Sequence, residues 1–259
     1  MPIVRLHDID AYYERQGRGP ALVLLHGLGS NCHDWDPHLA ALSAEFCAIA
    51  PDLRGFGQTP MPPGPYSIQR LADDLAALLD ELRVETSHVA GYSLGAAVAL
   101  QFAHDYAAHV KSLILINGRA CCIPGDRRAL FERVLRRGVI RCLGPRAAGW
   151  LVARRLFPEA GQAQQRAAFA ERYAGTDKRA YLAALDALVD WAPGRCIDEI
   201  DEPTLLIAST SGGGPQTAAL ATKLPKAELR LVPEVCQGTP YDSSGTLRTL
   251  MLDFLRSVR

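Results

Sequence analysis

No histidine follows position 109 in this chain of 259 residues. All seven histidines lie in its first part: His7, His26, His33, His38, His88, His104 and His109. Histidine is the side chain that most often accepts or donates a proton near neutral pH, because its ordinary pKa lies close to that range. Any mechanism that takes a histidine from the chain after position 109 is therefore excluded.

Long apolar runs, metal-ligand spacings and C-x-x-C motifs are also missing. Apolar stretches such as ALVLL at 21–25 fall far short of the roughly 18 residues that indicate a membrane span. The N-terminus has no basic region followed by an apolar run, so we expect no secretory signal. The seven cysteines form no C-x-x-C motif, which favours reduced thiols in a cytoplasmic protein. We expect no membrane span, no metal site and no cofactor.

A net charge is lacking as well, since 28 basic residues balance 28 acidic ones, and nothing global indicates nucleic acid as a partner. The balance hides an asymmetry. Residues 118–198 hold 15 basic and eight acidic residues, whereas the rest of the chain holds 13 and 20. Two interpretations of the basic segment stay open: solvated helical faces, or a surface that meets an anionic substrate, an acidic partner or a membrane surface.

Short strand-like runs alternate with helical patterns along most of the chain. The expected strands are 11–16, 21–27, 46–52, 88–91, 110–116, 204–209 and 227–232, and the expected helices are 67–83, 94–106, 216–224 and 243–258. This alternation predicts an α/β fold with a mostly parallel central sheet and helices on both faces. Residues 119–197 show only helical patterns, which predicts a helical insertion over one edge of the sheet.

The motif that carries chemistry is GYSLG at 91–95, a G-x-S-x-G pattern between an expected strand and an expected helix. Glycines at both ends make room for a sharp strand-to-helix turn, which holds the hydroxyl of Ser93 above the sheet. The N-terminus of the following helix supplies N–H groups and a partial positive charge to an anion.

A second glycine-containing loop, HGLG at 26–29, follows an apolar strand well upstream of the serine motif. Its glycines let backbone N–H groups turn toward the same point above the sheet, where they could meet a developing oxyanion. We expect His26 to orient this loop through hydrogen bonds, with a direct catalytic role as the alternative.

With these motifs in place, the chain resembles an α/β-hydrolase-fold protein of the small esterase/lactonase type over essentially its whole length. The matching stretches are HGLGSNCHDW (26–35), PDLRGFGQT (51–59), GYSLG (91–95) and PTLLIA (203–208). The resemblance implies a core domain of residues 1–117 and 199–259, a helical cap of residues 118–198 that shapes the pocket, Ser93 as the nucleophile, and an oxyanion hole formed by the N–H groups of Leu28 and Leu94. We expect the pocket to include His26, Gly27, Cys32, His33, Tyr92, Asn117, Trp150 and Trp191. An apolar pocket is indicated by Leu130, Phe131, Val134, Trp150, Phe157 and Trp191.

The family's acid and histidine positions are occupied by other residue types. In the loop where the acid belongs, STSGGGP at 209–215, Gly212 takes its place, and Gln237 stands where the family has its histidine. Glutamine accepts no proton near neutral pH, which removes general-base catalysis worth about 10² to 10⁴ in rate. Four possible substitutes are Glu234, Asp242, Cys236 and His33, and a structural role is the alternative for each.

We therefore expect an enzyme of this superfamily that acts on a small, largely apolar carbonyl compound such as an ester, lactone or ketone. An oxyanion hole and binding alone can leave catalysis of about 10³ to 10⁴ over water. The reaction could then be a cyclisation, an elimination or an isomerisation rather than a hydrolysis. The alternatives are a non-catalytic relative that binds a small molecule in the same pocket and a serine hydrolase whose triad has been inactivated.

Overall fold

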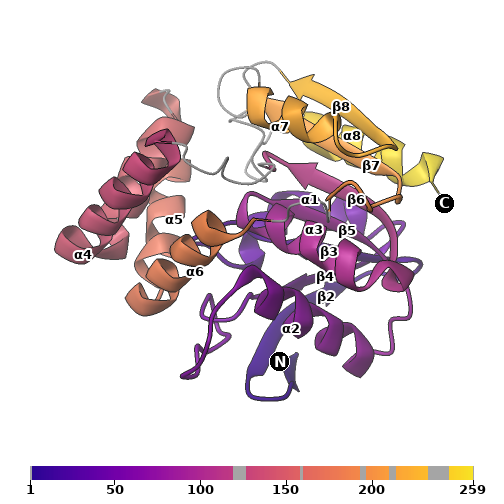
Figure 1. Cartoon of the computed structure of the whole chain (residues 1–259), viewed down its shortest axis with the longest axis horizontal. Coiled ribbons are helices and arrows are strands. Elements are labelled where there is room, and N and C mark those ends of the chain that lie inside the picture. The colour runs from indigo at the N-terminus through magenta and orange to yellow at the C-terminus, as the bar shows by residue number, and fades with distance from the viewer. Residues whose placement is uncertain are drawn as a thin grey trace.

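The computed structural model describes residues 2–118, 127–157, 160–192, 197–209, 214–232 and 245–258. In these residues eight strands form one sheet in the order β1-β2-β4-β3-β5-β6-β7-β8 (Figure 1). Strand β1 (Ile3–Arg5) pairs antiparallel with β2 (Asp10–Gln16), which pairs antiparallel with β4, and all further pairs are parallel. The predicted mostly parallel sheet is confirmed.

Nearly all predicted elements of the core are present. The parallel strands are β3 (Ala21–Leu25), β4 (Cys47–Pro51), β5 (Ser87–Tyr92), β6 (Val110–Ile116), β7 (Thr204–Ser209) and β8 (Ala227–Val232). The helices around them are α1 (Asp36–Leu42), α2 (Ile68–Glu81), α3 (Leu94–Asp105), α7 (Gly214–Ala221) and α8 (Thr246–Ser257). The sequence patterns missed β1 and α1, because such short elements show no clear period.

Helices cover the sheet on both faces, as predicted. Val23 and Leu25 of β3 pack with α2 and α3, whereas Leu22 and Leu24 pack with α1 and α8 on the other face. This division follows from the two-residue period of a strand, which turns successive side chains to opposite faces. Both sets of side chains are buried, so β3 is fixed in the centre of the molecule and its C-terminal end is a rigid support for the loop that follows.

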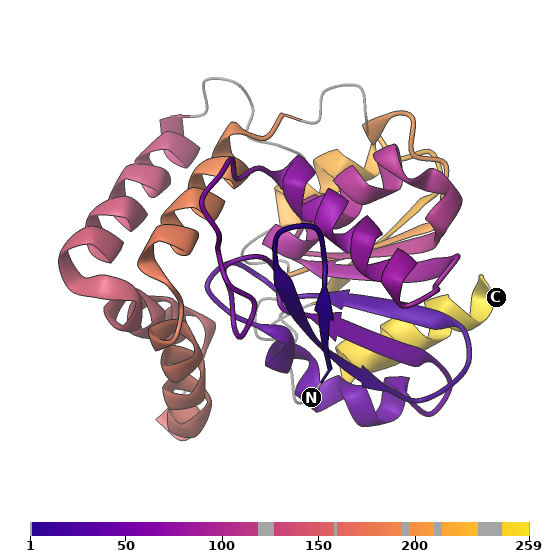
Figure 2. The ribbon, with the colours of Figure 1, turned by 90° about the horizontal axis from the view of Figure 1, so that it is seen from below.

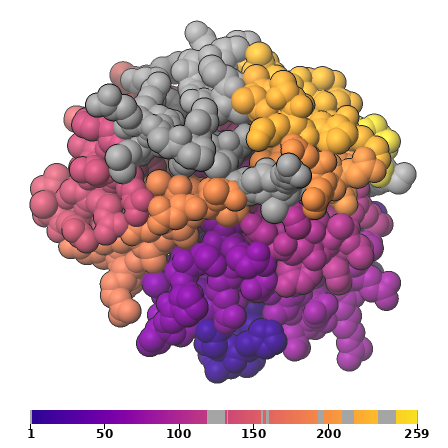
Figure 3. Space-filling view, viewed as in Figure 1, coloured from indigo at the N-terminus to yellow at the C-terminus, as the bar shows by residue number. Residues whose placement is uncertain are grey.

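Three helices lie in the chain between β6 and β7: α4 (Arg127–Leu156), α5 (Ala163–Ala174) and α6 (Lys178–Asp190). They lie together beside the sheet (Figures 1 and 2), and we call them the cap helices. α4 is kinked at Gly144, whose φ of 78° is not helical and which precedes Pro145. α6 contacts α2, and in the space-filling view its side chains lie against the N-terminal part of the chain (Figure 3). The division into a core domain and a cap domain stays a prediction.

The positive charge of residues 118–198 is partly neutralised by ion pairs within the cap helices. Arg133 and Arg137 of α4 both pair with Asp186 of α6, and Arg133 also reaches Asp190. These ion pairs fix the side of α4 that faces α6. In the described parts of the chain, no helix is both long enough and apolar enough to span a lipid bilayer.

Several large apolar side chains are exposed on α4. Among the described residues, six of the eight exposed large apolar side chains belong to α4: Phe131, Val134, Leu135, Leu143, Trp150 and Leu151. The exposed fractions of Phe131, Val134 and Trp150 are 66%, 61% and 43%, and their expected place in the pocket lining stays a prediction. Phe157 is buried, Trp191 is half-buried, and the side chain of Leu130 lies outside the described residues.

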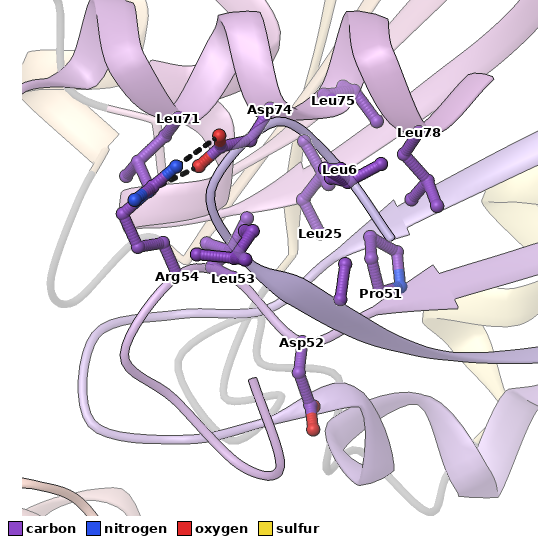
Figure 4. Close-up of a pocket in the computed structure, with 12 residues that line it drawn as sticks. Leu6, Leu25, Pro51, Asp52, Leu53, Arg54, Leu71, Asp74, Leu75 and Leu78 are labelled. Carbon is purple, nitrogen blue, oxygen red and sulfur yellow. Dashed lines mark hydrogen bonds and ion pairs between the residues drawn. The ribbon is translucent and has the colours of Figure 1, made fainter. Parts of the chain in front are cut away.

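A buried arginine ties the loop after β4 to two other segments. The side chain of Arg54 is 4% exposed and forms paired hydrogen bonds to Asp8, at 2.7 and 2.9 Å, and to Asp74 of α2, at 2.6 and 2.7 Å. Figure 4 shows the Arg54–Asp74 pair beside a small apolar cavity, with the carboxylate of Asp52 pointing away from it. Hydrogen bonds from Arg54 and its positive charge, with Arg70 nearby, hold the pKa of Asp8 well below its ordinary range.

We expect Arg54→Met to lower the free energy of unfolding at pH 7 by about 3–5 kcal/mol, because it removes the paired hydrogen bonds of the largely buried Asp74 and leaves only Arg70, at 3.8 Å. The control is Arg146→Met, which breaks an exposed pair with Glu171 and should cost less than about 1 kcal/mol. Urea denaturation measures both.

The difference in stability between the wild type and Arg54→Met should depend on pH. The pKa of Asp8 is lowered in the folded protein, so its contribution is complete above the ordinary aspartate pKa of about 3.9 and is lost as the pH falls below it. The stability difference between the wild type and Arg54→Met should therefore narrow below about pH 4. A difference that stays constant from neutral pH to well below this point would contradict this account.

Candidate active site

Ser93 lies in the turn between β5 and α3 with an unusual backbone conformation. Its φ of 52° and ψ of −103° fall in a region that L-residues rarely adopt, and such strain typically costs about 1–3 kcal/mol. The surrounding backbone holds it there: the N–H of Ser93 donates to the carbonyl of Ile116 at 3.0 Å, and its own carbonyl accepts from Ala96 and Ala97. The serine turn is thus fixed from β6 on one side and from α3 on the other.

The two glycines of the motif are required by close backbone contacts. A Cβ atom on Gly91 would lie 2.3 Å from the carbonyl oxygen of Gly95. A Cβ on Gly95 would lie 2.4 Å from the carbonyl oxygen of Leu25, at the end of β3. Both distances are far inside van der Waals contact, so only glycine lets β3, β5 and α3 meet at this point.

Ser93 directly precedes α3, so its hydroxyl lies next to the first N–H groups of that helix. Serine at the residue before a helix usually caps it by accepting from a backbone N–H, but Ser93 forms no such side-chain bond. Leu94 is the first residue of α3, so its N–H has no partner within the helix. The arrangement therefore places a hydroxyl group and a backbone hydrogen-bond donor on adjacent residues.

His26 holds the loop after β3 through both ring nitrogens. Nε2 accepts from the N–H of Leu53 at 3.0 Å, so Nδ1 carries the proton and donates to the carbonyl of Gly27 at 2.8 Å. The N–H of Ser30 donates to the same carbonyl at 3.3 Å. In a trans peptide the C=O and N–H point in opposite directions, so fixing the Gly27 carbonyl also directs the N–H of Leu28. These bonds agree with the orienting role expected for His26.

Asp52 joins this loop to the one after β4. Its carboxylate accepts from the N–H of Cys32 at 2.8 Å and from the N–H of Gln58 at 2.7 Å. Asp52 therefore stabilises its own loop and also the loop at 26–35. Burial and the nearby carboxylate raise the pKa of the Cys32 thiol, which keeps this cysteine protonated and unreactive.

The other expected pocket residues have contacts in different parts of the core. The ring of Tyr92 lies against Gly27, where a Cβ atom would be 2.7 Å away. Asn117 follows β6 with a φ of 49°, and its N–H donates to the carbonyl of Ile207. The indole of Trp191 donates to Gln101 of α3 at 2.8 Å. The ring of His33 pairs with Asp36 at 3.2 Å, and its side chain is 43% exposed at the surface.

The positions where the family pattern fails lie outside the described residues. This applies to Gly212 and Gln237, and to three possible substitutes for the base: Glu234, Cys236 and Asp242. Their roles stay predictions.

Comparisons with known proteins agree on the family. The sequence profile of the α/β hydrolase fold family matches residues 20–135, which include the serine turn. RutD of Pseudomonas savastanoi pv. phaseolicola, provisionally named a carbamate hydrolase, is 30% identical over 249 residues, covering 92% of this chain and 94% of that protein. The chain belongs to the α/β hydrolase family.

Two further relatives of this α/β hydrolase differ in how much they cover. RutD of Azorhizobium caulinodans is 35% identical over 147 residues, which is 57% of this chain and 54% of that protein, so the match spans about half of its length. The enol-lactonase from Burkholderia xenovorans LB400 superposes with a TM-score of 0.87 at 24% identity, covering 98% of this chain and all of that one. The second similarity concerns the fold alone.

Sequence patterns missed three residues of this α/β hydrolase that contact the loop after β3. All lie at or just after the end of α5: Arg172 donates to the carbonyl of His33, Tyr173 to that of Leu28, and Thr176 to that of Gly29. Their spacing matches no motif, and their acceptors lie far away in sequence. Only the packing of the cap helices on the core brings them together.

We expect Gly95→Ala to lower the free energy of unfolding of this α/β hydrolase by about 1–3 kcal/mol or more, because its Cβ meets the carbonyl of Leu25. Gly138→Ala is the matched control, since that helical glycine has no atom within 4 Å of an added Cβ. It should raise stability by up to about 1 kcal/mol. Thermal and urea unfolding measure both changes in stability. Equal effects of the two substitutions would contradict the close contact between Gly95 and the carbonyl of Leu25.

Proposed function

We propose that this α/β hydrolase acts on a small, apolar carbonyl compound of the ester, lactone or ketone type through Ser93. The N–H groups of Leu28 and Leu94 would form the oxyanion hole. The observation that carries this proposal is the geometry of Ser93: a strained residue at the start of α3 whose hydroxyl caps nothing.

In the proposed step, Oγ of Ser93 forms a bond to the carbonyl carbon, and the carbonyl π electrons move onto the oxygen. The two N–H groups stabilise this oxyanion, which is commonly the largest single contribution to such catalysis. With Gln237 at the histidine position, the hydroxyl proton passes to water. Collapse of the intermediate expels the alkoxide leaving group, and water later hydrolyses the acyl-serine.

A non-covalent use of the same site is part of the proposal. The oxyanion hole can polarise a carbonyl without a bond to Ser93, which favours cyclisation, elimination or isomerisation of a bound substrate. Such reactions need no water as a nucleophile, and the proton removed from carbon in an elimination or isomerisation would pass to water, since Gly212 and Gln237 stand at the acid and base positions.

The relatives support a carbonyl substrate. The RutD proteins are named for carbamate hydrolysis, and one of them aligns with this chain over nearly the full length of both. A carbamate presents the same kind of carbonyl group to a serine and an oxyanion hole as an ester does.

The second candidate function is a ligand-binding protein or an inactivated hydrolase, favoured by the residue types at positions 212 and 237. Strain at Ser93 favours the enzyme. A φ of 52° costs stability, and a turn that served only as a structural link would gain by placing glycine there.

A fluorophosphonate probe tests whether Ser93 is a nucleophile. We expect a phosphonyl adduct on the peptide that contains Ser93, with fluoride as the leaving group, and no adduct at that peptide in Ser93→Ala. Ser43→Ala, which changes a serine away from the serine turn, should label like the wild type. Mass spectrometry of the digested protein reads the outcome, and a wild type without an adduct at Ser93 would overturn covalent catalysis.

Restoring the family residues tests whether the triad is merely disarmed. Gln237→His together with Gly212→Asp should raise hydrolysis of an activated aryl ester by about 10² to 10⁴, the usual contribution of a general base. Gln237→His alone is the control and should give a smaller gain, since its imidazole lacks an orienting acid. No gain from the pair would show that these loops have moved away from triad geometry.

A further inference from the structure

The end of α5 is bonded directly to the loop that bears the proposed oxyanion donor. The hydroxyl of Tyr173 donates to the carbonyl of Leu28 at 2.7 Å, and the hydroxyl of Thr176 donates to the carbonyl of Gly29 at 3.1 Å. Both residues are buried, at 3% and 7% exposed. These bonds join parts of the chain that are far apart in sequence.

Shape complementarity accompanies the hydrogen bonds. Gly29 has a φ of 83°, and a Cβ atom there would lie 2.4 Å from the ring of Tyr173. The ring therefore occupies the space that a side chain at position 29 would take. The loop can approach α5 this closely only because it carries glycine, and the contact leaves Tyr173 no other position.

The contact acts on the residue that matters for the oxyanion hole. The peptide before Leu28 is fixed through the Gly27 carbonyl, by His26 and Ser30. The peptide after Leu28 is fixed through its own carbonyl, by Tyr173. With both flanking peptides held, the backbone of Leu28 has no freedom to rotate, and its N–H keeps one direction.

Tyr173 is itself held from three helices. It stacks on Phe169 of α5 with ring centroids 4.9 Å apart, it lies 5.9 Å from the ring of Tyr181 in α6, and Gly149 of α4 gives it room. Burial raises the pKa of its phenol well above the ordinary value, so the hydroxyl remains a donor at any working pH. The position of the Leu28 carbonyl therefore depends on the packing of all three cap helices.

We propose that Tyr173 is a positioning residue for the oxyanion hole, acting on the chemistry at Ser93 through the Leu28 carbonyl and without touching the substrate. This inference rests on the proposed function. It makes the cap helices part of the catalytic geometry, because a movement of α5 away from the loop would remove the bond to the Leu28 carbonyl and leave the backbone of Leu28 held only through the Gly27 carbonyl.

The test compares Tyr173→Phe with Tyr66→Phe. Both substitutions remove a tyrosine hydroxyl that donates to a backbone carbonyl, but Tyr66 donates to Arg54, at 2.9 Å, and not to the loop after β3. We expect Tyr173→Phe to slow phosphonylation of Ser93 about tenfold, a fraction of the roughly 10² to 10³ lost when an oxyanion donor is removed. Tyr66→Phe should react at the wild-type rate.

Two further readouts separate positioning from general loosening. Amide hydrogen exchange in residues 27–31 should be faster in Tyr173→Phe and unchanged in Tyr66→Phe. The preference for an aryl ester over its thionoester should fall in Tyr173→Phe only, because sulfur is a poor acceptor and gains little from the hole. A merely structural defect would slow both substrates alike.

The outcomes distinguish the two proposals. A wild type without labelling at Ser93 overturns the proposed function and this inference with it. A labelled wild type with equal rates in Tyr173→Phe and Tyr66→Phe, and an unchanged ester preference, overturns this inference alone.

Discussion

The contact on which the rest of this structure depends is the approach of the serine turn to the end of β3. Gly95 touches the carbonyl of Leu25 so closely that no Cβ atom fits, and Gly91 touches Gly95 in the same way. This contact places the start of α3 beside the loop that follows β3. The proposed oxyanion hole needs the N–H groups of Leu28 and Leu94 to meet here, and everything proposed for the site assumes this convergence.

Two buried polar side chains near the serine turn hold backbone groups in place. His26 uses both ring nitrogens on the backbone, and Asp52 accepts from two loops at once. His88, on the neighbouring strand, pairs with Ser112 inside the sheet. Buried polar groups need such partners, because a lost hydrogen bond in the interior costs about 1–3 kcal/mol. The rings of His26 and His88 are thus engaged in structural hydrogen bonds. No histidine after His109 is present to take the place of a catalytic base.

Sequence patterns predicted the features that depend on residues close together in the chain. The alternation of strands and helices and the serine turn were readable, because periodicity and glycine placement report directly on backbone conformation. The partial exposure of Trp150 could not be predicted, since a helical period gives the spacing of a face but not which neighbour covers it. Tyr173 was not readable either, because its role comes from a partner far away in sequence that only tertiary packing supplies.

The ring of Tyr173 in the space above Gly29 has a consequence for how such proteins can change. The cap helices form one continuous insertion between β6 and β7, which an engineer could replace as a whole. Here a replaced α5 would have to bring an aromatic donor of the same size to the same glycine, or the core loop would lose its support. Helices grafted between β6 and β7 would therefore have to fill the space above Gly29 and donate a hydrogen bond to the Leu28 carbonyl.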